Sequence, residues 1–179
     1  MLPPFGRRFP KTFMDLNDLP DGAPIFIDAN IFIYHFTGIS IECRVMLERS
    51  ERKNIRSATG THIILEVLHR LMMIEALSKS LITPGQPAKK LKRNLDAIRL
   101  LRDYNRCVTE IRHLGVRVYP TTLKQIRNSE IIRTAYGVMT NDSVTAAMML
   151  NYGITNLATL DSDLHRIPGL DLYLPTDVP

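Results

Sequence analysis

The stretch Pro24-Ile25-Phe26-Ile27-Asp28-Ala29-Asn30 decides how the rest of the chain is interpreted. Three consecutive apolar residues end at an acidic residue, as expected for a strand that is buried on both faces of a sheet. Ligands of open parallel sheets bind beyond the carboxyl ends of the strands. The pattern therefore predicts a buried strand over 24–27, with Asp28 at the chemically active edge of the sheet.

Short apolar segments and amphipathic segments alternate along the rest of the chain. We expect strands over 55–58, 116–119, 157–160 and 170–174, and helices over 41–52, 61–78, 88–114, 123–135 and 143–151. Strands that alternate with helices build a mainly parallel sheet with helices on both faces. A chain of 179 residues usually forms one domain. The sequence thus predicts an α/β domain over 24–179, preceded by a proline-containing arm over 1–23.

Three further acidic residues fall where this fold would bring them to the same edge. Asp161 follows a predicted strand, Asp142 stands where a predicted helix begins, and Glu66 lies inside the helix predicted over 61–78. Each acid alone has a simpler explanation, as a helix cap, an Asx turn or an ion-pair partner of Arg70. Carboxylates gathered at one edge repel one another unless a divalent cation neutralises them, and oxygen-only ligands select Mg²⁺ or Mn²⁺.

Charge is unevenly distributed along the chain. The net charge is +5, but residues 89–133 hold 12 Lys or Arg and 4 Asp or Glu, whereas the remainder holds 11 basic and 14 acidic residues. This layout suggests a polyanion on one face and a cation bound elsewhere, although charge counting alone fits a solvated helix face equally well. Four basic residues fall in the first turns of the helix expected over 88–114, where the helix dipole disfavours cations, so contacts to phosphate are favoured: Lys89, Lys90, Lys92 and Arg93.

Several classes of protein are excluded. The two cysteines, Cys43 and Cys107, provide neither a disulfide scaffold nor a zinc ribbon. No apolar run is long enough for a membrane span, and the basic N-terminus is not followed by the apolar segment of a signal peptide. P-loop, dinucleotide-binding, serine-hydrolase and zinc-hydrolase motifs are absent from the sequence. We therefore expect a cytoplasmic protein without a membrane partner.

Four motifs, in this order and spacing, resemble the PIN-domain family of metal-dependent ribonucleases. The motifs are Phe26–Ile33, Ile64–Val67 with its Glu66, Asn141-Asp142 before the small-residue segment Val144–Met148, and Ala158–Leu164. They cover about residues 24–174, and the single small domain looks most like VapC-type toxins. The resemblance implies a three-layer α/β/α sandwich with a central, mainly parallel sheet. It also implies an endoribonuclease that uses Mg²⁺ or Mn²⁺ and leaves a 5′-phosphate and a 3′-hydroxyl.

The resemblance also implies roles for individual residues. The catalytic metal site would consist of Asp28, Glu66, Asp142 and Asp161, with Asp163 as a further or water-mediated ligand. Asn30 would support Asp28 from behind, and Thr159 would orient Asp161 or a water molecule. RNA is the implied substrate, with the basic segment at 89–93 as its clamp.

Partners and the biological role stay open at this point. An antitoxin protein and a homodimer are the partners that the resemblance to VapC-type toxins implies. A housekeeping RNA-processing nuclease, a nuclease-inactive RNA-binding PIN module and a DNA nuclease of related fold are the alternatives. The 23-residue arm and the long basic segment over 78–94 depart from the family's pattern, and they bear on the toxin assignment more than on the nuclease chemistry.

Overall fold

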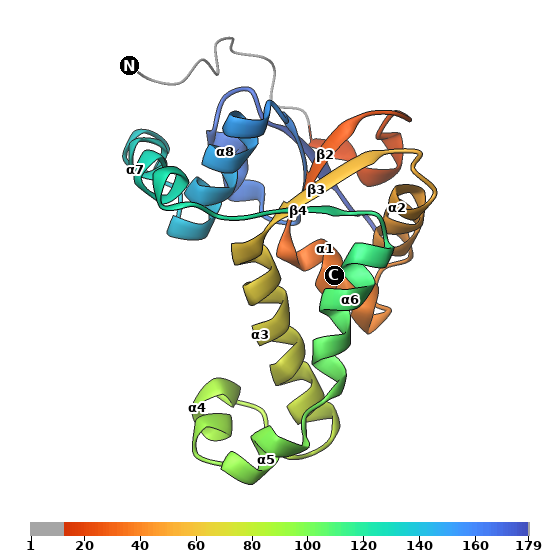
Figure 1. The fold of residues 1–179 in the computed structure, drawn as a ribbon, viewed down its shortest axis with the longest axis vertical. Coiled ribbons are helices and arrows are strands. Elements are labelled where there is room, and N and C mark those ends of the chain that lie inside the picture. Colours follow the sequence, from red (N-terminus) through yellow and green to blue (C-terminus); the bar gives the residue numbers. More distant parts are fainter. Residues whose placement is uncertain (1–12, 179) are drawn as a thin grey trace.

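A parallel sheet forms the centre of the molecule (Figure 1). The computed structural model describes residues 13–178. Within these residues, six strands lie in the order β1-β6-β5-β2-β3-β4, and every neighbouring pair is parallel. The strands are β1 (Phe13–Asp15), β2 (Pro24–Ile27), β3 (Arg56–Gly60), β4 (Arg117–Tyr119), β5 (Asn156–Ala158) and β6 (Asp171–Leu174). The predicted α/β fold with its parallel sheet is confirmed.

The chain changes direction across the sheet at β2. From β2 it proceeds to β3 and β4 on one side, and it later returns to β5 and β6 on the other side. Because right-handed crossovers that run in opposite directions place their helices on opposite faces, this order produces two helical layers. The carboxyl end of β2 therefore lies at the topological switch point, where open α/β sheets bind their ligands.

Helices cover both faces of the sheet. One group follows β2 and β3 and contains α1 (Ala29–Thr37), α2 (Ile41–Glu51), α3 (Thr61–Ser78), α4 (Pro87–Lys92), α5 (Leu95–Leu100) and α6 (Arg106–His113). The other group, α7 (Leu123–Tyr136) and α8 (Thr140–Tyr152), packs as a pair. Short 3-10 turns cover Leu16–Asp18, Asp103–Asn105 and Ser162–Arg166.

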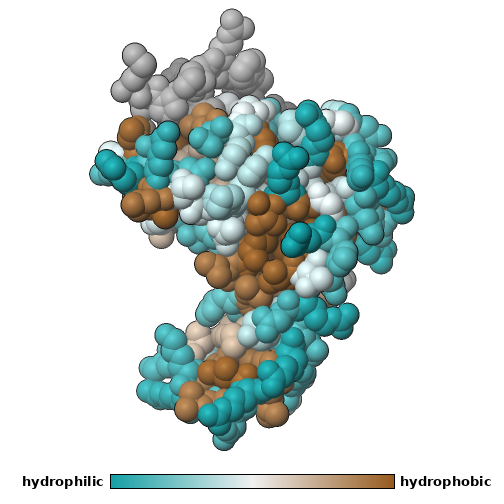
Figure 2. Space-filling view, viewed as in Figure 1, coloured by the Kyte–Doolittle hydropathy of each residue, from teal (hydrophilic) through white to brown (hydrophobic). Residues whose placement is uncertain are grey.

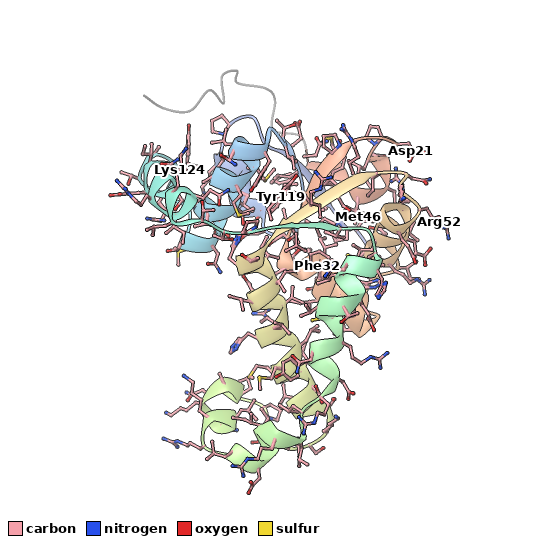
Figure 3. All side chains as sticks on the ribbon, in the orientation of Figure 1. Asp21, Phe32, Met46, Arg52, Tyr119 and Lys124 are labelled. Carbon is pink, nitrogen blue, oxygen red and sulfur yellow. The ribbon has the colours of Figure 1, made fainter. Side chains whose placement is uncertain are left out.

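The main core lies between the sheet and its helices. Ile25, Phe26 and Ile27 of β2 are completely buried, as the uninterrupted apolar run predicts. Phe32 of α1 and Met46 of α2 point into the same interior, whereas charged side chains such as those labelled at the molecule's periphery point outward (Figure 3). Because both faces of β2 are buried, a polar side chain is accommodated only at the end of this strand, where Asp28 stands.

A tip projects from the sheet-bearing body. α3 runs away from the sheet, α4 and α5 lie at its far end, and α6 leads back (Figure 1). The tip has its own small core, which consists of Met73, Ala76, Ile82, Leu91, Ala97 and Leu101. The surface around both parts is largely hydrophilic, with apolar areas where the tip meets the body and on the tip itself (Figure 2).

The expectation of one continuous helix over 88–114 is wrong. α4 ends at Lys92, and the side-chain oxygen of Asn94 accepts the backbone N–H of Ala97 at 3.0 Å to begin α5. After α5, the backbone N–H groups of Arg102 and Tyr104 donate to the buried carboxylate of Glu75 on α3 instead of continuing a helix. A local cap at Asn94 and the Glu75 anchor on α3 therefore divide a segment whose apolar spacing suits a single helix.

Part of the segment expected to form an N-terminal arm lies within the fold. Residues 13–15 form β1, which pairs with β6, and Leu16 and Leu19 are buried. Residues 1–12 of the expected arm lie outside the described residues. Among residues 13–178, no helix combines the length and apolarity that a bilayer span needs.

Candidate active site

Asp28 stands at the end of β2 and caps the first turn of α1. Its Oδ1 accepts the backbone N–H of Ala29 at 2.7 Å. Its Oδ2 accepts hydrogen bonds from the Asn30 amide at 3.0 Å and from the Thr159 hydroxyl at 2.7 Å. Capping and side-chain contacts together hold the carboxylate in one orientation at the edge of the sheet.

Thr159 and Asn30 connect the ends of two neighbouring strands. Thr159 is fully buried just after β5, and its hydroxyl both donates to Asp28 and accepts the backbone N–H of Asp161 at 2.9 Å. Asn30 accepts the backbone N–H of Leu160 at 3.2 Å. The loop that carries Asp161 is thus hydrogen-bonded to the residues around Asp28, and the roles of Asn30 and Thr159 in catalysis stay predictions.

Glu66 and Asp142 come from two further elements. Glu66 lies in the second turn of α3 and is half-buried, and Asp142 lies in the first turn of α8. The side-chain amide of Asn141 donates to Glu66 Oε2 at 3.1 Å, so the start of α8 is hydrogen-bonded to α3. Asn141 is a site residue whose role sequence reasoning missed, although its position next to Asp142 in the quoted motif was the available signal.

Asp28 and Asp142 lie close enough to other carboxylates for these to affect their ionisation. Burial, together with the negative charges of Glu66 and Asp142, raises the pKa of Asp28 to about 6 against the hydrogen bonds from Thr159 and Ala29. Burial also raises the pKa of Asp142, to which Asp161, Glu66 and Asp163 add their repulsion. The structure thus brings all five predicted acids into one electrostatic neighbourhood that favours a positively charged partner.

The side chains do not form a closed metal cage. Within residues 13–178, no group of three His, Cys, Asp or Glu side chains is arranged to hold a metal ion on its own. Mg²⁺ usually keeps several water molecules and takes only one or two carboxylates together with substrate phosphates. An open carboxylate cluster suits that mode of binding, and the assignment of individual ligands stays a prediction.

Asp163 lies at the rim of the cluster. Its side chain is 56% exposed and forms an ion pair with Arg166 at 2.9 Å. Its backbone N–H donates to Asp161 Oδ1 at 2.8 Å, which makes Asp161 the cap of the following 3-10 turn. Asp163 is therefore partly neutralised by Arg166, whereas no ion pair to Asp28, Glu66 or Asp142 occurs in the described part of the chain.

The basic segment has a different structural setting from the one expected. Lys89, Lys90 and Lys92 lie in the last turn of the short helix α4, where the dipole favours cations, so the expected penalty at a helix start does not apply. Lys90 donates within its own loop, to Thr83 Oγ1 at 2.6 Å and to the Pro84 carbonyl at 2.7 Å. Lys89, Lys92 and Arg93 are exposed and available to an anionic partner.

Comparisons with known proteins agree with this architecture. A family model described as PIN domain matches residues 25–170. The curated protein Ribonuclease VapC2 of Methanocaldococcus jannaschii is 23% identical over 170 residues, which cover 83% of this chain and 91% of that protein.

Two solved structures contain chains of similar shape. One is the crystal structure of VapBC2 from Rickettsia felis bound to a DNA fragment from their promoter, with a TM-score of 0.55, 16% identity, and coverage of 84% of this chain and 98% of that chain. The other is a toxin–antitoxin complex from Klebsiella pneumoniae, with a TM-score of 0.48, 18% identity, and coverage of 86% and 97%. At these identities the first of the two supports the fold.

Proposed function

We propose, since this chain belongs to the PIN-domain family, that it is an endoribonuclease whose hydrolysis of phosphodiester bonds depends on Mg²⁺ or Mn²⁺. The observation that carries the proposal is the convergence of acidic side chains from the end of β2, α3, α8 and the loop after β5, where the neighbouring carboxylates make Asp28 and Asp142 harder to ionise. The curated relative is named a ribonuclease, which supports RNA as the substrate.

The donor set fits a hard divalent cation. It consists of carboxylate oxygens only, and the raised pKa values of Asp28 and Asp142 reflect burial and repulsion that a cation would offset. Asp28, Glu66, Asp142 and Asp161 would surround the ion, one or two of them directly and the others through bound water, with Asp163 as an outer contributor. When bound, the cation would stabilise negative charge on the phosphate and make a water molecule more acidic.

The chain's own residues orient the carboxylates for this task. A carboxylate offers about four lone-pair sites, and three donors occupy sites on Asp28. One lone pair of the Asp28 carboxylate stays available for a cation, and the three hydrogen bonds fix its direction. Asn141 orients Glu66 in the same way from α8.

An antitoxin protein is the partner that we propose besides RNA. The name of the curated relative supports this choice, and so does the Rickettsia felis structure, in which VapBC2 is bound to a DNA fragment from their promoter. We expect a small protein encoded beside this chain to inhibit its RNA cleavage in a purified mixture. Homodimerisation stays a prediction that sedimentation of the purified chain would check.

Cleavage of single-stranded RNA by the purified chain tests the proposal. We expect cleavage with Mn²⁺ or Mg²⁺, none with EDTA, and none by Asp28→Asn or Asp142→Asn. Asp171→Asn is the matched control, because Asp171 is an exposed aspartate at the amino end of β6, away from the carboxyl edge. Cleavage by Asp142→Asn at the rate of the Asp171→Asn control would show that the site is wrong.

Calorimetric titration with Mn²⁺ separates the proposal from a nuclease-inactive RNA-binding module. The unmodified chain should bind Mn²⁺, and Asp142→Asn should bind it more weakly. Because burial and repulsion raise the pKa of Asp142, its amide variant should fold at least as stably as the unmodified chain at pH 7. Lack of Mn²⁺ binding by the unmodified chain would favour the inactive module.

A further inference from the structure

A pocket of about 680 Å³ lies between α1, α3 and the start of α4. We propose that it binds one unpaired RNA base next to the phosphate that is cleaved. The inference rests on the proposed function, and it adds a specificity-determining subsite to it. A volume of this size is within the range of pockets that hold small ligands.

The pocket begins where the carboxylate cluster ends. Asn30, whose amide donates to Asp28, is also part of the pocket wall. On α3, His69 and Arg70 follow Glu66 by three and four residues, and the pocket extends to Ile74. Because α3 rises about 1.5 Å per residue, the part of the pocket wall that it forms reaches roughly 12 Å from Glu66, at Ile74. A base in the pocket would thus belong to a nucleotide beside the one whose phosphate meets the carboxylates.

The lining of the pocket matches a base with its attached phosphate. The lining includes the buried apolar side chains of Ile33 and Met73. Tyr34 from α1 and His69 from α3 contribute aromatic rings from the two helices, and aromatic rings stack on bases of any sequence. Arg70 on α3 and Lys89 on α4 are exposed cations at the wall. Proteins bind single-stranded RNA in apolar clefts that offer aromatic rings for stacking and basic side chains at the border.

Charge distinguishes this pocket from a neighbouring one on α3. None of the residues that line the 680 Å³ pocket is acidic. The neighbouring pocket, of about 460 Å³ between α1, α3 and α6, is lined by Glu75, Asp103 and Glu110 against one arginine, Arg106. That balance repels phosphate, whereas Arg70 and Lys89 attract it. The helix α4 lies beside the far half of α3 (Figure 1), so its basic residues extend the cationic border away from the carboxylates.

A binding cycle with a short RNA tests the pocket without relying on cleavage. The probe is a five-nucleotide single-stranded RNA, together with versions that lack one base at a single position. The protein is the full chain with Asp142→Asn, which keeps the RNA intact. We expect loss of one particular base to weaken binding at least about fivefold. With Tyr34→Leu added, loss of the same base should change the affinity less than twofold, because the stacking partner is gone.

Arg70→Ala and Arg106→Ala form a matched pair of exposed arginines, one from each pocket. Arg70→Ala should weaken RNA binding and lower the slope of log affinity against log salt by about 0.7, whereas Arg106→Ala should change neither. An equal effect of base removal with and without Tyr34→Leu would overturn the proposal, as would equal effects of the two arginine variants. Failure of the unmodified chain to cleave RNA would count against the proposed function and leave these binding results interpretable.

Discussion

Glu75→Gln should loosen the attachment of the tip to α3. The carboxylate of Glu75 is 7% exposed. It accepts the backbone N–H groups of Arg102 at 2.9 Å and Tyr104 at 2.8 Å, and Lys79 Nζ at 2.6 Å. Burial alone would raise the pKa of Glu75, but the Lys79 ammonium and the two N–H donors outweigh it and lower the pKa to about 2. The fold therefore stabilises the charged form.

The expected loss of stability is about 2–4 kcal/mol. Glutamine keeps the length of the side chain but has one carbonyl oxygen, so one backbone N–H loses its acceptor and the other loses a charged one. Each hydrogen bond to a charged group contributes roughly 1.5–3 kcal/mol. A pKa lowered from 4.5 to about 2 corresponds to about 3 kcal/mol, which lies within this range. Lys79 keeps its ion pair with Asp103 at 2.8 Å, which limits the loss.

Urea unfolding of both proteins at several pH values measures this effect. Ionised Glu75 stabilises the fold fully above the pKa that this residue has in the unfolded chain, near 4.5. This stabilisation decreases as the pH falls towards about 2, the pKa of Glu75 in the folded chain. The difference between the unmodified chain and Glu75→Gln should therefore shrink from pH 6 to pH 2.5. Glu110→Gln, which removes a half-exposed partner of Arg106 at 3.4 Å, should cost less than about 1 kcal/mol. A constant difference at every pH would refute the argument.

Substitutions at three other positions are informative. Thr159→Val removes the hydroxyl that donates to Asp28 at 2.7 Å, so RNA cleavage should slow about 10–100-fold; Thr159→Ser should restore most of the rate, and equal rates for both variants would contradict this role. Gly60→Ala places a Cβ 2.6 Å from the His62 ring, which two threonine hydroxyls hold in place, so thermal unfolding should reveal a loss of roughly 1–3 kcal/mol. Lys92→Ala removes an exposed cation of α4 and should reduce the salt dependence of RNA binding by about 0.7 in slope; an unchanged slope would remove Lys92 from the RNA contact surface.

The site could be placed at one edge of the sheet from the sequence, but its internal contacts could not. The run Ile25-Phe26-Ile27 marks a strand buried on both faces, so the residue after it must emerge at the edge. That Asn141 donates to Glu66 is different, because the two residues lie on α8 and α3 and are 75 positions apart. Their contact depends on how the two helices pack, and no local pattern encodes that.

Local sequence patterns determined most strands and helices of this chain, because periodic burial and backbone preferences are properties of neighbouring residues. The tertiary structure alone decided that the expected helix over 88–114 breaks again after α5, since Glu75 of α3 accepts the backbone N–H groups that the helix would have used. It also decided that β1 joins the sheet, because its partner β6 stands at the opposite end of the chain. Contacts between distant segments depend on which buried surfaces meet, and that is a property of the folded chain as a whole.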